Sequence, residues 1–199
     1  VFPHPGPTGF GILATNPNGM SVVDWARNLA HLSIADLDMG LAKAGQGPGH
    51  VFADPGFTPL PHVAATPGFG GSLSGLTLAT TPVDIVRAVL EGIACRFSLT
   101  LDLFRRHGIQ PMLIRATGGG AKSAWWMQLK ADLTGLPVEV VAQDEPGAFG
   151  AAILAGVGAG AYGSVSDAVR DLVAVGRRYE PDPDRGALYG GVCRRLEER

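Results

Sequence analysis

Residues 117–123 read Thr-Gly-Gly-Gly-Ala-Lys-Ser and separate an apolar stretch from a stretch with helical character. Three consecutive glycines permit positive φ and leave no Cβ between the main chain and a ligand. Ser123 suits the N-cap of the following helix, and N–H groups at a helix start suit an anion or a nucleotide. The spacing is not that of a Walker phosphate loop. This segment is therefore either a flexible turn or a ligand-binding loop.

The sequence on both sides of this loop alternates between strand and helix patterns. Residues 111–117 and 137–142 are short apolar runs typical of strands, whereas residues 123–133 and 145–158 are typical of helices. Such alternation favours an α/β domain whose ligand loops follow the carboxyl ends of the strands.

A long helix is predicted to begin at Pro82. Thr81 is a good N-cap, Pro82 suits the first helical position, and Asp84 complements the helix dipole. Apolar residues then recur every three or four positions until a cationic turn and Gly108 end the pattern. Weaker patterns predict a helix near 21–31, strands near 11–15 and 72–78, and helices over 167–174 and 185–199.

Composition restricts the kinds of partner. The chain has 199 residues, 46% of them hydrophobic and 17% charged, which is typical of a globular protein. Its net charge of -2 provides no basic excess for nucleic acid. Cys95 and Cys193 lie far apart in the sequence, so we expect neither a disulfide framework nor a cysteine zinc site, and we expect a reducing cytoplasmic location. The five histidines do not fall at metal-binding spacings, so no metal ligand is assigned.

Two further patterns have simpler explanations. Residues 146–166 carry no charge, but six of them are glycine, so we expect a close-packed helix rather than a membrane span. Gly158, Gly160 and Gly163 form a GxGxxG pattern that follows a helix rather than a strand, which disfavours a dinucleotide-binding fold. The N-terminus has no secretory signal, and we expect the chain to be a piece of something longer. Aspartates such as Asp132, late in a predicted helix, are expected to be solvated.

Several segments, in order along the chain, resemble the C-terminal domain of the FGGY carbohydrate kinases, which include xylulokinases, ribulokinases and glycerol kinases. The matching segments are 75–77, 87–92, 117–123 with Trp126, 130–132 and 147–155. The resemblance is strongest over residues 73–164 and weaker over 16–30.

The resemblance implies an actin-like, ribonuclease H-like ATPase domain with a mixed sheet flanked by helices. In this family two such domains flank a cleft, and the C-terminal one holds most of the ATP. By analogy, Gly119, Gly120 and Ala121 would lie against the adenosine, while Gly118 and Ser123 would shape the loop. The Mg²⁺ ligands are expected mainly from the N-terminal, sugar-binding domain, which this chain does not contain.

Two departures limit what the resemblance implies. Residues 56–61 replace a Gly-Glu-Arg-Thr-Pro-like segment of the family, and the chain has no Asp-x-Gly-Thr phosphate loop. No catalytic residue is therefore assigned, and the sugar stays unidentified.

Our interpretation is that residues 1–199 are the ATP-binding half of a sugar kinase, which transfers the γ-phosphoryl group of ATP to a hydroxyl of a sugar or polyol. The chain alone is expected to be inactive, and neither nucleic acid nor membrane is an expected partner. The alternative is a non-catalytic, actin-like module for nucleotide binding or assembly. An exposed Trp125 would offer a face for a homodimer.

Overall fold

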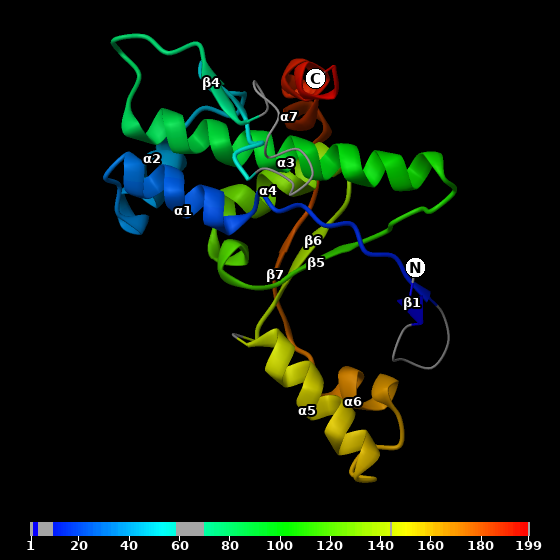
Figure 1. Cartoon of the computed structure of the whole chain (residues 1–199). Helices are drawn as coiled ribbons and strands as arrows, with labels where there is room; N and C mark the ends of the chain where they lie inside the picture. The colour runs from blue at the N-terminus through cyan, green and yellow to red at the C-terminus, as the bar shows by residue number, and fades with distance from the viewer. Residues whose placement is uncertain (1, 4–9, 59–69, 144, 199) are drawn as a thin grey trace.

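The computed structural model describes residues 2–3, 10–58, 70–143 and 145–198 (Figure 1). The helices are α1 (Met20–Leu29), α2 (Ile34–Lys43), α3 (Pro82–Arg106), the 3₁₀ helix η1 (Gly119–Lys122), α4 (Ala124–Thr134), α5 (Pro146–Gly158), α6 (Val165–Leu172), α7 (Pro183–Leu188) and α8 (Gly190–Glu197). The strands are β1 (Phe2–Pro3), β2 (Phe10–Gly11), β3 (Phe52–Asp54), β4 (Ser72–Ser74), β5 (Ile114–Ala116), β6 (Val138–Val141) and β7 (Val175–Tyr179).

Helix α3 runs through the middle of the main body, and α1, α2, α4, α8 and β3 pack around it (Figure 1). It begins at Pro82 as predicted. The Thr81 hydroxyl accepts a hydrogen bond from the Asp84 amide, and the Asp84 carboxylate accepts one from the Thr81 amide, so two helix-start donors are satisfied. On the buried side of α3, a Cβ at Gly92 would lie 2.6 Å from the Ala53 carbonyl oxygen, so the close approach of β3 requires glycine there.

The main sheet has the order β5-β6-β7 and is mixed, as the fold prediction requires. β5 and β6 pair in parallel, and β6 and β7 pair antiparallel. Its apolar side chains, such as Val138, pack with α4 into the core, whereas the opposite face carries a row of charges. Glu139 lies in the middle of that row, 3.4 Å from Arg115 and 2.7 Å from Arg178. Within the described residues, the outer edge of β5 has no strand partner.

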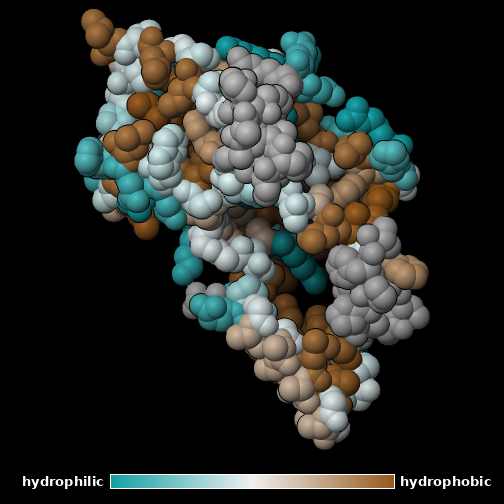
Figure 2. Space-filling view, viewed as in Figure 1, coloured by the Kyte–Doolittle hydropathy of each residue, from teal (hydrophilic) through white to brown (hydrophobic). Residues whose placement is uncertain are grey.

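Helices α5 and α6 pack on each other and extend from the far end of the sheet as an arm (Figure 1). Ile153 is the one residue of α5 classed as buried, and Leu154 is 45% exposed. Figure 2 shows mainly apolar residues over this arm. None of the helices in the described ranges has the length and apolarity that a membrane crossing needs. The expectation of a close-packed helix over residues 146–166 was wrong, because α5 buries only Ile153 and packs mainly on α6.

Several elements differ from the prediction. α2, β3 and β7 were not predicted, and the single helix expected over 185–199 is two helices, α7 and α8. Strand structure near 11–15 is limited to β2, and near 72–78 to β4. Asp132 is buried rather than solvated, because its carboxylate pairs with Arg185 and accepts a hydrogen bond from the Asp182 amide.

The prediction that the two cysteines form no disulfide was wrong. Cys95 on α3 and Cys193 on α8 are joined by a disulfide, so the C-terminal helix is tied covalently to the central helix. A separation of 98 residues in sequence gave no sign of this pairing, because the packing of α8 on α3 brings the two positions together.

We predict that a reducing agent lowers the free energy of unfolding of the oxidised chain by about 2–4 kcal/mol, because it frees a long loop in the unfolded state. Denaturant unfolding with and without reductant measures the difference. The variant Cys193→Ser is the control and is expected to unfold identically in both conditions. Equal stability of the parent chain with and without reductant would contradict the prediction.

Candidate functional site

The glycine loop lies between β5 and α4, as the sequence predicts. Gly118 has a φ of 82°, and residues 119–122 form the 3₁₀ helix η1, in which the Ala121 amide donates to the Gly118 carbonyl. Of the three glycines, only Gly118 takes the left-handed conformation. Ser123 caps α4, because its hydroxyl accepts a hydrogen bond from the Trp126 amide.

The three glycines have different surroundings. A Cβ added at Gly118 or Gly119 would meet no atom within 4 Å, so the main chain there borders open space. A Cβ at Gly120 would lie 2.8 Å from Cζ3 of Trp126 and 3.0 Å from Sδ of Met20. The first two glycines therefore leave room beside the main chain, and the third permits close packing behind it.

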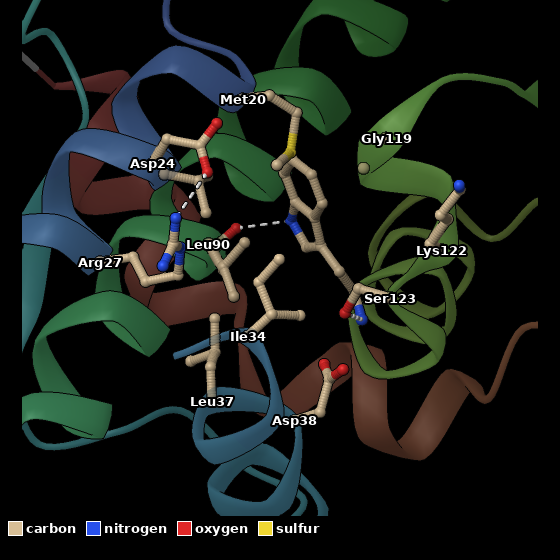
Figure 3. A pocket seen from close by; sticks show the side chains of 13 residues that line it. Met20, Asp24, Arg27, Ile34, Leu37, Asp38, Leu90, Gly119, Lys122 and Ser123 are labelled. Carbon is tan, nitrogen blue, oxygen red and sulfur yellow. Dashed lines mark hydrogen bonds and ion pairs between the residues drawn. The ribbon is translucent and has the colours of Figure 1, made fainter. Parts of the chain in front are cut away.

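A pocket of about 320 Å³ lies beside Gly119, Gly120 and Ser123. Figure 3 shows this pocket with side chains from α1 and α2 opposite the loop. Met20, Asp24 and Arg27 come from α1, and Ile34, Leu37 and Asp38 come from α2. The apolar members suit a flat ring, while Asp24, Arg27 and Asp38 add charged groups to the lining. Arg27 lies 3.7 Å from the Asp24 carboxylate.

A second hollow of about 190 Å³ lies on the other side of η1, against the carboxyl end of β6. Gly118 and Ala121 line this second hollow and not the larger pocket, and Lys122 borders both. The predicted site residues therefore divide into two groups, with Gly119, Gly120 and Ser123 at the larger pocket.

The pocket walls from α1 and α2 were not predicted as site residues. The only signal for α1 was the weak family resemblance over residues 16–30. For α2, Ser33 and Asp36 have the spacing of a capped helix start, and the Ser33 hydroxyl accepts a hydrogen bond from the Asp36 amide, but no helix was predicted there.

Trp126 forms the wall behind the loop. It is only 3% exposed, its indole N–H donates to the Leu90 carbonyl over 3.0 Å, and the Lys130 ammonium lies 3.8 Å from its ring centroid. Burial lowers the pKa of Lys130 to about 8. Trp125, by contrast, is half-buried with the Arg87 guanidinium over its ring, so it does not provide the exposed dimer face that the sequence suggested.

A buried polar network on α3 holds the loop at residues 45–49. Arg87 binds Glu91 over 2.8 Å and also donates to backbone carbonyls of this loop, while the Gly49 amide donates to Glu91. Tyr189 closes the network with a hydrogen bond to Glu91, and burial raises the pKa of its hydroxyl, which keeps it a donor. This network ties α3 to the loop at residues 45–49 and to Tyr189. Leu90, whose carbonyl accepts the hydrogen bond from Trp126, lies on the same helix.

We predict that Gly120→Val destabilises the chain by about 1–3 kcal/mol, because the new side chain overlaps Trp126 and Met20. The matched variant Gly119→Val enters open space and is expected to change stability by about 0.5 kcal/mol or less. Denaturant unfolding of the two variants beside the parent measures both effects. An equal loss of unfolding free energy in the two variants would contradict the difference in packing between Gly119 and Gly120.

Comparison with known proteins identifies the family of this chain and its fold. The model of the C-terminal domain of the FGGY family of carbohydrate kinases matches residues 3–159. Xylulose kinase of Staphylococcus epidermidis is 34% identical over 119 residues, which cover 60% of this chain and 24% of that protein. Glycerol kinase of Pseudomonas fluorescens is 34% identical over 182 residues, which cover 87% of this chain and 36% of that protein.

Solved structures show the same fold. Xylulose kinase from Rhodospirillum rubrum matches 90% of this chain and 37% of its own, with a TM-score of 0.70 and 27% identity. Plasmodium falciparum glycerol kinase, solved with ADP, has a TM-score of 0.73 at 24% identity and covers 90% of this chain and 36% of its own. This chain thus spans between a quarter and about a third of the length of the relatives it matches.

Proposed function

Since the chain belongs to the FGGY family of carbohydrate kinases, as a C-terminal domain, we propose that residues 1–199 are the nucleotide-binding part of a sugar or polyol kinase. The complete enzyme would transfer the γ-phosphoryl group of ATP to a hydroxyl of its substrate. An N-terminal domain outside this chain would bind the sugar.

The observation that carries this proposal is the open main chain at Gly119 beside a pocket of about 320 Å³. A base and ribose need apolar surface for the ring and a close approach to backbone groups, and the pocket provides both. We assign the adenosine to this pocket, with Gly119, Gly120 and Ser123 in contact and Gly118 and Ala121 supporting the loop. A structural neighbour solved with ADP supports a nucleotide as the ligand.

The chain contributes positioning rather than chemistry in this proposal. Phosphoryl transfer needs in-line placement of the phosphates, Mg²⁺ to neutralise them, and a carboxylate that accepts the hydroxyl proton. No group of three His, Cys, Asp or Glu side chains that could hold a metal occurs within the described residues. We assign neither metal ligand nor catalytic base to this chain, and expect the Mg²⁺ ligands mainly from the N-terminal domain.

The substrate class rests on the relatives. Xylulose and glycerol kinases are among them, so a ketose or a polyol is the expected acceptor. The segment at residues 56–61, which departs from the family pattern, lies partly outside the described residues. We therefore propose the class of acceptor and not its identity.

A non-catalytic, actin-like module for nucleotide binding or assembly is the second candidate, because the pocket beside Gly119 would serve such a module equally. A coding sequence upstream of Val1 that contains an Asp-x-Gly-Thr phosphate loop would favour the kinase, and its absence would favour the module.

We predict that Gly119→Val weakens ATP binding by about tenfold or more, because the valine occupies space beside the loop that the adenosine needs. Calorimetry of the folded variant with ATP measures the dissociation constant. The matched control is Gly191→Val on α8, where an added Cβ also meets no atom within 4 Å, and its affinity should equal that of the parent. Unchanged affinity in folded Gly119→Val would remove the adenosine assignment.

We also predict that the purified 199-residue chain transfers no phosphate, because the acceptor site and the catalytic carboxylate are assigned to the absent domain. ADP release is measured with ATP and Mg²⁺, with and without xylulose or glycerol. The expected rates are equal in all samples. Release of ADP that depends on the sugar would show that the chain alone is a kinase.

A further inference from the structure

Lys130 is a partly buried cation on α4, one helical turn after Trp126. Its ammonium lies 3.8 Å from the Trp126 ring centroid and 5.7 Å from that of Phe97 on α3. Among the described residues it makes neither an ion pair nor a hydrogen bond with a side-chain acceptor. Two aromatic rings are therefore the main neighbours that the structure gives this charge.

The charged side chains on the elements around α4 do not serve as partners of Lys130. Arg87 pairs with Glu91, Asp102 with Arg105, Asp132 with Arg185, Arg96 with Asp54, and Glu139 with Arg115 and Arg178. Asp84 on α3 accepts a hydrogen bond from Thr81, and Arg106 on α3 pairs with Glu197. The remaining charges on these elements are Asp36, Asp38 and Lys43 on α2, Lys122 on η1, Asp184 on α7 and Arg177 on β7. Burial is the one cause that lowers the pKa of Lys130, so none of these charges shifts it.

The Trp126 indole contacts Lys130 and also lines the pocket. The indole is fixed at its N–H by the Leu90 carbonyl, and its six-membered ring lies against Gly120 and lines the pocket. The cation sits against the same indole. A cation over an indole is attracted to it, and the attraction is strongest when the cation is desolvated. A change at Lys130 thus acts on the wall that supports the glycine loop.

We propose that Lys130 is a positioning residue of the nucleotide pocket, which holds the Trp126 indole in the orientation that supports Gly120. This inference rests on the proposed nucleotide site and adds a residue that does not itself line the pocket. The positioning depends on the charge and not on the bulk of the side chain.

The attraction between Lys130 and the Trp126 ring depends on pH, because it requires the charged ammonium. The ammonium is intact below a pKa of about 8 and is lost above it, so the attraction to the ring is present at low pH and disappears as the pH rises. Because burial depresses this pKa below that of a free lysine, the charge opposes folding at pH values below about 8, and this cost is relieved as the pH rises from there toward the pKa of a free lysine. Replacement by an apolar side chain of similar length is therefore compatible with a folded chain.

The test compares Lys130→Met with Lys130→Arg, which keeps a charge at all relevant pH values. Trp25 and Trp125 are both replaced by phenylalanine in every protein, so that fluorescence reports Trp126 alone, and circular dichroism checks the fold. The parent is expected to show a fluorescence transition centred near pH 8, and both Lys130 variants are expected to show none. Lys43→Met, which removes an exposed lysine on α2, is the control and should titrate like the parent.

ATP affinity is measured on the same proteins. At neutral pH we expect Lys130→Met to bind ATP about fivefold or more weakly than the parent and Lys130→Arg to bind within about twofold. Above the transition, the affinity of the parent should fall to that of Lys130→Met. A parent transition that persists in Lys130→Met, or equal ATP affinity in folded parent and Lys130→Met, overturns the inference while leaving the nucleotide site intact. A Trp126 transition that requires Lys130, in proteins that bind no ATP, would support the positioning and reject the nucleotide function.

Discussion

The burial of α3 is the constraint on which the pocket depends. α1, α2 and α4 each pack on this helix, and η1 is attached to the start of α4. Val86 and Val89 are fully buried in its N-terminal third, and the glycine at position 92 allows β3 to approach closely. Each buried aliphatic side chain contributes about 1.5–3 kcal/mol. The pocket forms where helices that pack on α3 leave space between them and the glycine loop.

The site also shows that three identical residues in a row have separate roles. Gly118 provides a left-handed turn, Gly119 provides open main chain, and Gly120 accommodates the Trp126 ring. The indole is in turn fixed by the Leu90 carbonyl and by Lys130. The shape of the pocket therefore depends on contacts behind the loop as much as on the loop itself.

The sequence predicted the features that are determined locally. The capping box at Thr81, the Ser123 cap and the alternation of strand and helix from residue 111 to 158 depend on neighbouring residues, and the structure confirms them. The pocket walls, the Cys95–Cys193 bond and the burial of Asp132 depend on residues brought together over long separations. β7 was missed because its sequence, Val-Gly-Arg-Arg-Tyr, has no apolar alternation that marks a strand, and Arg178 pairs with Glu139 on the charged face. Family resemblance named the loop residues but did not name the helices opposite them.

The arm of α5 and α6 and the unpaired edge of β5 expose surfaces of the kind that other proteins in a cell bind. Within the described residues, α5 leaves most of its apolar surface to solvent and β5 leaves main-chain donors and acceptors unpaired on one side. Surfaces of these two kinds attract chaperones, proteases and other copies of the same polypeptide. A surface that covered the arm and this edge would therefore protect the polypeptide from aggregation and degradation.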